Sequence, residues 1–267
     1  MTTLPPLAEE LDLLVGATAE AAEAALALFR NGAKVWTKAG GSPVTEADMA
    51  VDALLRERLT AARPGYGYLS EESVDDGSRL TAPRTFIVDP IDGTRSFMAG
   101  TTDWTIPVAI VEAGRPVVAV LLAPARGEDY RAIAGGGATR DGQPIHISDR
   151  TTIEDARLAV SQRLLKSEAL PRPIRAKSVF HASLAYRLAR VADGRLDGAA
   201  VKPNAQDWDL AAADLLVHEA GGRLRTVDGD PPRYDRDTTA HGAMIAGGPA
   251  LSEALADIVT QVMRHGI

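Results

Sequence analysis

Residues 87–97 read Ile-Val-Asp-Pro-Ile-Asp-Gly-Thr-Arg-Ser-Phe, and this stretch decides how the whole chain is interpreted. The apolar residues at its start predict a buried strand over residues 85–88. That strand delivers Asp89 and Asp92, on either side of a Pro-Ile pair, to the edge of a turn. Two carboxylates at this spacing can bridge one divalent ion or divide between two neighbouring ions. We therefore expect a metal-binding turn directly after a buried strand.

The second half of the same stretch suits a phosphate group. Gly93 allows the backbone to approach a ligand closely. The amides of Gly93 and Thr94, at the start of a predicted helix, would point partial positive charge at a phosphate. The carbonyl oxygen of Ile91 is a further hard ligand for a metal ion. Metal and phosphate are thus expected to meet on one turn.

Two further segments bring carboxylates to the ends of predicted elements. Glu71 follows a strand expected at residues 66–69, and Asp209 begins an apolar helix expected at residues 210–220. Asp209 alone is also consistent with an N-terminal helix cap, and an Asp-x-x-Asp pair alone with a solvated turn. Together, acidic positions at three strand or helix ends match the oxygen ligands of a hard cation. We therefore treat them as one site.

The composition limits the ligands and partners of such a site. The formal net charge of -7 gives no general attraction to nucleic-acid polymers or anionic membranes. The sequence contains no cysteine, so oxygen or imidazole ligands would hold a metal ion. No apolar stretch approaches the roughly 20 residues of a transmembrane helix, and residues 1–10 lack the pattern of a secretory signal. We expect a cytoplasmic globular protein with a small-molecule partner.

The hydrophobic pattern mixes helical and strand periods without a regular strand-helix repeat, which predicts a layered α+β sandwich rather than a barrel. Thr45 and Asp48 have the spacing of a capping box at a helix start. An N-terminal lobe (residues 1–150) would carry most metal ligands, and a C-terminal lobe (residues 151–267) would supply Asp209 and substrate contacts. Helices are expected at residues 7–29, 45–62, 183–192, 210–220 and 251–263. Strands are expected at residues 66–69, 85–88, 104–111, 116–122, 158–161 and 176–179, with short strands within 135–147.

Four ordered motifs resemble the signatures of the inositol monophosphatase family of magnesium-dependent, lithium-sensitive phosphatases. They are Ser-Pro-Val-Thr-Glu-Ala-Asp at residues 42–48, Ser-Glu-Glu-Ser at 70–73, the stretch 89–97, and Trp208-Asp209 followed by Glu-Ala-Gly-Gly at 219–222. The resemblance covers most of the chain. It implies an αβαβα sandwich of the inositol monophosphatase and fructose-1,6-bisphosphatase type, two or three Mg²⁺ ions, and a homodimer.

The resemblance also implies how the metal ligands are shared. Glu71, Asp89 and the carbonyl oxygen of Ile91 would hold a first Mg²⁺. Asp89, Asp92 and Asp209 would hold a second, and Glu71 would assist a third. Water activated by these ions would attack phosphorus in line, without a phosphoenzyme.

The same resemblance implies functions for residues that lie beside the metal ligands. Thr94, together with Glu71, would orient the attacking water, and Asp48 would orient Thr94 through a hydrogen bond. Asp48 is also consistent with a carboxylate that only stabilises the first turn of its helix. Gly93, Thr94 and Lys38 would contact the substrate phosphate, while an exposed lysine such as Lys38 is also consistent with a solvated charge.

Lys202 is the position that bears on the identity of the substrate. Family members that hydrolyse inositol monophosphate place an acidic residue a few positions before the last metal-binding aspartate, where this chain has Lys202. A cation there suits a second anionic group of the substrate. We therefore favour adenosine 3',5'-bisphosphate, hydrolysed to AMP as by bacterial 3'(2'),5'-bisphosphate nucleotidases, which the chain also resembles. Inositol monophosphate, histidinol phosphate and sugar bisphosphates are the alternatives.

A non-catalytic phosphate-sensing or protein-interaction module on the same fold is the alternative of a different class. Such a module would be expected to have lost one or more of Glu71, Asp89, Asp92, Thr94 and Asp209. The sequence retains all five. We therefore expect an enzyme.

Overall fold

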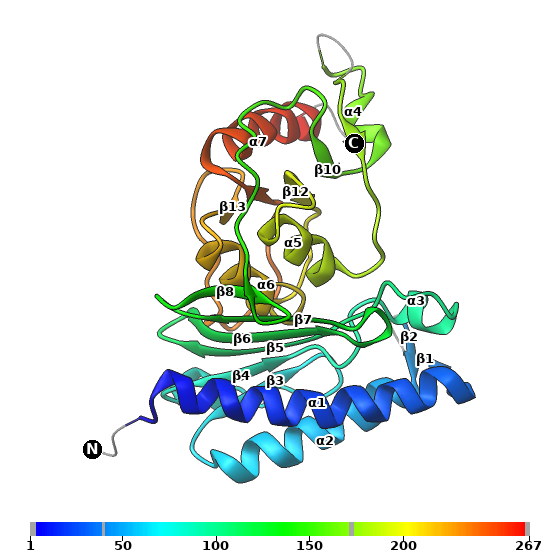
Figure 1. Cartoon of the computed structure of the whole chain (residues 1–267), viewed down its shortest axis with the longest axis vertical. Helices are drawn as coiled ribbons and strands as arrows, with labels where there is room; N and C mark the ends of the chain where they lie inside the picture. The colour runs from blue at the N-terminus through cyan, green and yellow to red at the C-terminus, as the bar shows by residue number, and fades with distance from the viewer. Residues whose placement is uncertain (1–3, 39–40, 171–173, 265–267) are drawn as a thin grey trace.

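The computed structural model describes residues 4–38, 41–170 and 174–264, and it shows alternating layers of helices and sheets (Figure 1). A seven-stranded sheet and a five-stranded sheet are each covered by helices on both faces. The expected layered α+β sandwich is confirmed. From one side of the molecule to the other, the helical layers are α1 (Leu7–Asn31) with α2 (Glu46–Ala62), then α5 (Leu184–Ala192) with α6 (Asp207–Glu219), then α7 (Pro249–Arg264) with the short α4 (Gln162–Leu165).

The seven-stranded sheet follows chain order from β3 to β9. β3 and β4 run parallel, and each later pair of neighbours runs antiparallel. Successive side chains of β4 and β5 point to opposite faces: Phe86 and Val108 belong to the core under α1 and α2, whereas Ile87 and Ala109 belong to the core shared with α6. The strands are β3 (Gly67–Ser70), β4 (Thr85–Val88), β5 (Ile106–Glu112), β6 (Arg115–Ala123), β7 (Glu128–Ile133), β8 (Gly137–Arg140) and β9 (Gln143–Pro144).

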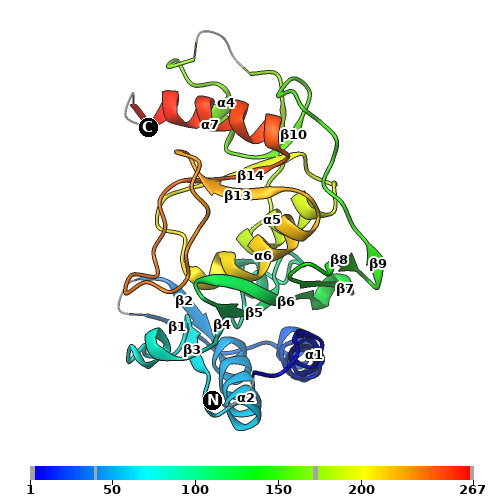
Figure 2. The same ribbon diagram turned by 90° about the vertical axis from the view of Figure 1, so that its left-hand side faces the viewer.

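The five-stranded sheet has the order β11-β10-β12-β14-β13 and lies between α5 and α6 on one face and α7 on the other (Figure 2). Leu158, Ile245 and Leu251 belong to the core under α7. A separate two-stranded hairpin, β1 (Val35–Thr37) and β2 (Pro43–Thr45), precedes α2. The strands of the five-stranded sheet are β10 (Arg157–Ala159), β11 (Lys177–Ser178), β12 (Gly198–Val201), β13 (Arg223–Thr226) and β14 (Met244–Gly247).

Most of the expected helices and strands are present, with boundaries moved by a few residues. The helix expected at 210–220 begins earlier, at Asp207, so Asp209 lies within its first turn. The sequence-based prediction missed β1, β2, β7, β12, β13 and β14 and the short helix α4. β12 reads Gly-Ala-Ala-Val and β14 reads Met-Ile-Ala-Gly, and such short segments with small residues carry a weak strand signal.

The proposed division near residue 150 falls between the last strand of the first sheet and the first strand of the second. The seven-stranded sheet ends at Pro144 and the five-stranded sheet begins at Arg157. α6 contacts strands of both sheets, so the two parts share one layer of helices. The division into lobes stays a prediction, and its outermost residues, 1–3 and 265–267, lie outside the described residues. Among the described residues, no helix is long and apolar enough to cross a membrane.

Candidate active site

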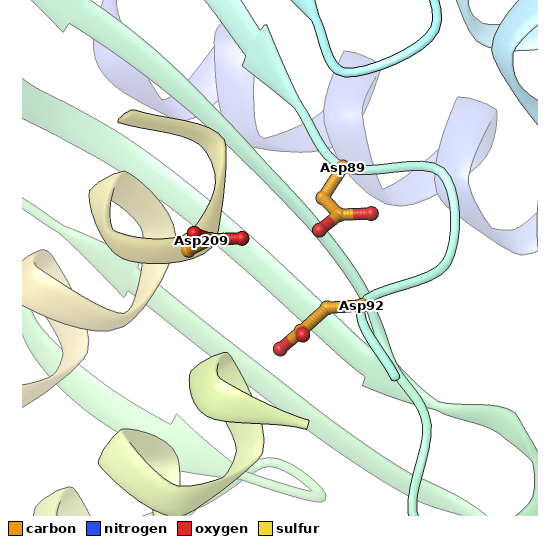
Figure 3. Close-up of side chains that lie close together, drawn as sticks. All are labelled: Asp89, Asp92 and Asp209. Atoms are coloured by element: carbon orange, nitrogen blue, oxygen red, sulfur yellow. The ribbon is translucent and has the colours of Figure 1, made fainter. Parts of the chain in front are cut away.

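Asp89, Asp92 and Asp209 meet in space (Figure 3). Each offers a carboxylate oxygen, and these three oxygens lie within 4.8 Å of one another. Asp89 directly follows β4, Asp92 lies in the turn before α3 (Thr94–Met98), and Asp209 lies in the first turn of α6. Asp89 is 1% exposed and Asp92 8% exposed. The fold thus brings carboxylates from two distant segments to one buried point.

Asp92 is held by the start of α5. Its Oδ2 accepts a 2.6 Å hydrogen bond from the hydroxyl of Ser183 and a second, also 2.6 Å, from the amide of Ala185. Ser183 is itself the N-cap of α5 and accepts a hydrogen bond from the amide of Tyr186 at 2.9 Å. A helix cap therefore fixes the orientation of a predicted metal ligand. No local pattern predicts this pairing, because the two residues are far apart in the chain.

Asp209 serves as part of a helix cap as well as a member of the cluster. Its Oδ2 accepts a 2.7 Å hydrogen bond from the amide of Gln206, the N-cap of α6. Its side chain points toward Asp89 and Asp92 (Figure 3). The capping interpretation and the metal-ligand interpretation of Asp209 are therefore compatible.

Burial raises the pKa of all three carboxyl groups. For Asp89, the charges of Asp92 and Glu71 add to burial, and the pKa lies well above its usual range. Burial and the charge of Asp92 raise the pKa of Asp209 to about 7. For Asp92, burial outweighs the hydrogen bonds from Ser183 and the α5 amides, so its pKa is also raised. A bound cation would relieve this mutual repulsion, and an oxygen-only ligand set suits Mg²⁺.

Thr94 and Asp48 are in direct contact beside the cluster. The hydroxyl of Thr94 lies 3.2 Å from Oδ1 of Asp48 and 3.1 Å from the carbonyl oxygen of Ile91. Oδ2 of Asp48 accepts hydrogen bonds from the amide of Thr45 at 2.8 Å and from its hydroxyl at 2.5 Å, so the capping box of α2 is present. Asp48 is buried, and burial raises its pKa. One carboxylate thus joins the cap of α2 to the turn that carries the cluster.

Gly93 is required by the close approach of two backbone segments. Its φ is +98°, and a Cβ atom there would lie 2.6 Å from the carbonyl oxygen of Asp103. Any other residue would push the turn away from the loop before β5. Gly93 therefore sets the position of Asp92 and Thr94 on either side of it.

Glu71 and Lys38 form an ion pair at the edge of the site. Nζ of Lys38 lies 2.9 Å from Oε1 of Glu71 and 2.6 Å from Oε1 of Glu72. Glu71 is not one of the three clustered carboxylates, although its charge acts on Asp89. Glu71 as a metal ligand and Lys38 as a phosphate contact stay predictions.

An open cavity of about 550 Å³ adjoins Thr94 and Glu71. Arg95 of α3 lines this cavity. Sequence analysis did not identify Asp103 or Phe180 as site residues, and both also line it. We call this cavity the cleft; its remaining lining residues are Ser42, Pro43, Gly93, Ser96, Thr101 and Ala182.

Lys202 lies elsewhere. It follows β12 and lines a second cavity, of about 500 Å³, together with Arg163 of α4 and Met263 of α7. None of the residues lining this cavity lines the cleft. The role of Lys202 as a substrate contact stays a prediction. Its position on a separate cavity does not support that role.

Carboxylates gathered on a layered α+β scaffold, next to an open cleft, define a candidate metal-dependent hydrolase. The chain belongs to the inositol monophosphatase family, whose model matches residues 7–264. The family consists of phosphatases, so the protein is a phosphoric monoester hydrolase, and the predicted enzyme class is confirmed.

Individual relatives carry different substrate names. A histidinol-phosphatase of Mycobacterium tuberculosis is 38% identical over 208 residues, covering 73% of this chain and 78% of the relative. A 3'(2'),5'-bisphosphate nucleotidase CysQ of Aggregatibacter actinomycetemcomitans is 30% identical over 231 residues, covering 81% of this chain and 84% of the relative. The crystal structure of the extragenic suppressor protein suhB of Bartonella henselae superposes with a TM-score of 0.82 at 26% identity, covering 97% of this chain and all of that one.

Proposed function

We propose that this protein is a Mg²⁺-dependent phosphomonoesterase that hydrolyses a small phosphate ester by attack of an activated water. The observation that carries the proposal is the approach of the three carboxylate oxygens of Asp89, Asp92 and Asp209 to within 4.8 Å. Within the described part of the chain, no lysine or arginine forms an ion pair with any of the three. The charge of Arg187 lowers the pKa of Asp92 and of Asp209, but burial keeps both raised. Protons or a bound cation would therefore balance the remaining charge.

Asp89, Asp92 and Asp209 would hold Mg²⁺, together with the carbonyl oxygen of Ile91 and with Glu71. Bound there, Mg²⁺ supplies a water of lowered pKa and stabilises negative charge on the leaving oxygen. The family resemblance predicts that two or three Mg²⁺ ions take part. Lithium sensitivity and a homodimer are further predictions of the same kind, and a cytoplasmic location is a prediction from the composition.

Thr94 would position the attacking water. When its hydroxyl donates to Asp48, at 3.2 Å, the oxygen of Thr94 can accept a hydrogen bond from a water molecule. Asp48 is fixed by two hydrogen bonds from Thr45, so the direction of the Thr94 hydroxyl is set before substrate arrives. Asp48 therefore acts as a positioning residue, and Thr94 touches the water.

For the substrate, we rank histidinol phosphate first. The relative named histidinol-phosphatase is 38% identical, whereas the relative named bisphosphate nucleotidase is 30% identical. Adenosine 3',5'-bisphosphate, favoured on the basis of Lys202, ranks below it because Lys202 lies on a cavity that shares no lining residue with the cleft. Histidinol phosphate thus moves ahead of the substrate favoured from the sequence, and inositol monophosphate stays an alternative.

The decisive experiment compares kcat/KM for histidinol phosphate, adenosine 3',5'-bisphosphate and inositol 1-phosphate with Mg²⁺ present. We expect histidinol phosphate to be preferred. A preference for the bisphosphate that is lost in Lys202→Glu, but kept in the exposed control Lys177→Glu, would establish the second candidate instead. No turnover of any phosphate ester, with Mg²⁺ binding intact, would favour the non-catalytic module.

A further inference from the structure

Asp103 and Phe180 are cleft residues that have no role in the predicted metal site. Both line the cavity that Thr94 and Glu71 also line. Asp103 comes from the loop between α3 and β5, and Phe180 from the segment between β11 and α5. The two segments meet through His181, whose Nδ1 lies 3.2 Å from Oδ2 of Asp103. The neighbour of Phe180 in the chain therefore touches Asp103 directly.

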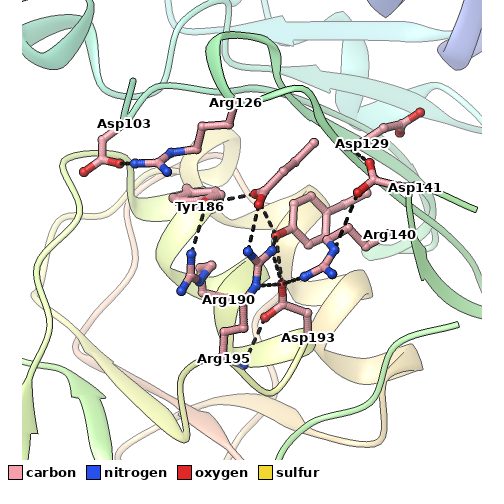
Figure 4. A network of polar contacts seen from close by, with 11 residues as sticks. Asp103, Arg126, Asp129, Arg140, Asp141, Tyr186, Arg190, Asp193 and Arg195 are labelled. Carbon is pink, nitrogen blue, oxygen red and sulfur yellow. Dashed lines mark hydrogen bonds and ion pairs between the residues drawn. The ribbon is translucent and has the colours of Figure 1, made fainter. Parts of the chain in front are cut away.

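The carboxylate of Asp103 is held in a fixed orientation. Its Oδ1 accepts a hydrogen bond from the guanidinium of Arg126, and Arg126 in turn lies over the ring of Tyr186, 5.2 Å from its centroid (Figure 4). The amide of Asp103 donates to the hydroxyl of Ser96 at 3.2 Å. Neither Arg126 nor His181 lines the cleft, whereas Asp103 does. Asp103 therefore lies on the wall of the cleft, and the two side chains that hold its carboxylate lie outside the lining.

The charge of Asp103 is balanced by one partner only. Burial lowers the pKa of His181, more than the neighbouring Asp103 raises it, so His181 is neutral at pH 7. Arg126 remains charged and is the only cation that pairs with Asp103 within the described residues. Each carboxylate oxygen has more than one acceptor site, so Asp103 can still accept a hydrogen bond from a ligand in the cleft.

Phe180 supplies an apolar surface on the same cleft as Asp103. Its side chain is 78% exposed, which is unusual for a large aromatic residue. The guanidinium of Arg187 lies 6.0 Å from the ring centroid and leaves most of the ring open to solvent. An exposed ring beside a substrate cleft can pack against a planar group of a ligand.

We propose that Asp103 and Phe180 form the subsite for the leaving group, and that this subsite selects a planar nitrogen heterocycle with a cationic or N–H donor group over a neutral polyol. The inference rests on the proposed function and names the residues that would give it specificity. Asp103 accepts a charge-assisted hydrogen bond from the nitrogen group, and Phe180 packs on the ring. A polyol offers neither a cation nor a planar face.

The test measures kcat/KM for histidinol phosphate and for glycerol 2-phosphate in the wild type and in four variants. Asp103→Asn should lower the ratio of the two values about tenfold, because it removes the charge that strengthens the hydrogen bond. Phe180→Leu should lower the ratio roughly threefold or more, and Phe180→Tyr, which keeps the ring, should restore it. Asp129→Asn is the matched control, since Asp129 also pairs with an arginine and has a similarly exposed side chain.

Binding of L-histidinol and of glycerol to the same proteins, measured calorimetrically with Mg²⁺ and phosphate present, gives a readout independent of turnover. Weaker L-histidinol binding in Asp103→Asn and Phe180→Leu, with Asp129→Asn like the wild type, would support the subsite. A wild type without preference for histidinol phosphate, but which hydrolyses another heterocyclic ester selectively through Asp103, would overturn the proposed substrate alone.

A wild type that prefers histidinol phosphate, together with unchanged ratios and unchanged L-histidinol binding in the variants, would overturn the subsite and leave the proposed function standing. The oligomeric state of each variant is measured by sedimentation. If Phe180→Leu changes the oligomeric state without changing the ratio, Phe180 belongs to a contact between copies and its role in the subsite is wrong.

Discussion

Ser183 donates a 2.6 Å hydrogen bond to Oδ2 of Asp92, although 91 positions separate the two residues in the chain. Ser183 is also the N-cap of α5, where its oxygen accepts a hydrogen bond from the amide of Tyr186. The same hydroxyl therefore caps the N-terminus of α5 and orients a predicted metal ligand in the turn before α3. Residues that orient a metal ligand contribute to metal affinity as well as to local stability.

Replacing Ser183 by alanine should weaken Mg²⁺ binding more than it weakens the fold. Asp92 keeps its hydrogen bond from the amide of Ala185, so its position is loosened but not lost. We expect the Mg²⁺ concentration for half-maximal activity to rise roughly 10- to 100-fold. Ser252→Ala is the control, since Ser252 is buried and donates to a carbonyl at the start of α7. An unchanged Mg²⁺ requirement in Ser183→Ala would show that this hydrogen bond does not matter to the site.

The raised pKa of Asp209, about 7, makes the effect of Mg²⁺ depend on pH. Because the folded state binds this proton more tightly than the unfolded state, the metal-free protein should lose stability as pH rises from about 4 to about 7. Mg²⁺ competes with the proton, so the rise in Tm on adding Mg²⁺ should be larger at pH 8 than at pH 6. Thermal unfolding with and without Mg²⁺ at both pH values measures this. Equal rises in Tm would mean that the carboxylates are already ionised at pH 6.

Variants of Thr45 and Asp48 distinguish the role of Asp48 in capping α2 from its role in positioning Thr94. Thr45→Ala removes the N-cap of α2 and should lower the free energy of unfolding by about 1 kcal/mol. Asp48→Asn should lower kcat roughly 10- to 100-fold, because the hydroxyl of Thr94 loses its charged partner. Urea unfolding and steady-state kinetics on both variants make the comparison. If Asp48→Asn loses stability but keeps kcat, Asp48 is only a capping residue.

Asp207 and His241 form a buried pair just before the predicted metal ligand on α6. Nε2 of His241 lies 2.6 Å from Oδ1 of Asp207, and both residues are buried. His241→Ala leaves the carboxylate of Asp207 without this partner and should cost about 3 kcal/mol of stability. The double variant with Asp207→Asn should recover part of that loss in urea unfolding. His218→Ala, an exposed histidine on the same helix, is the control; a double variant no more stable than His241→Ala would argue against the pairing.

Local sequence patterns were sufficient for much of the scaffold. Apolar runs predicted β4, β5 and β6, and the spacing of Thr45 and Asp48 predicted a capping box that the structure contains. These signals succeed because they depend on residues close together in the chain. β12 and β14 lacked such a signal, since their small side chains pack between α5, α6 and α7 only after the layers have assembled.

The metal ligands of the candidate site were predictable from the sequence, but the residues that orient those ligands and line the cleft were not. The carboxylates Asp89, Asp92 and Asp209 were grouped from motifs, and the structure brings them together. The hydrogen bond from Ser183 and the position of Asp103 on the cleft depend on contacts between segments far apart in the chain. Lys202 was assigned by its distance from Asp209 along the sequence, which does not determine the cavity that its side chain lines.

The most direct test of the account is Mg²⁺-dependent phosphate release by Asp209→Asn. Asparagine keeps the shape of the side chain and removes the charge that would hold the cation. We measure release from the best wild-type substrate over a range of Mg²⁺ concentrations, with Asp257→Asn on the exposed face of α7 as the control and circular dichroism as the check on folding. The account predicts a folded protein with phosphate release at background for Asp209→Asn and wild-type release for the control. Near-normal, Mg²⁺-dependent release by Asp209→Asn would contradict it.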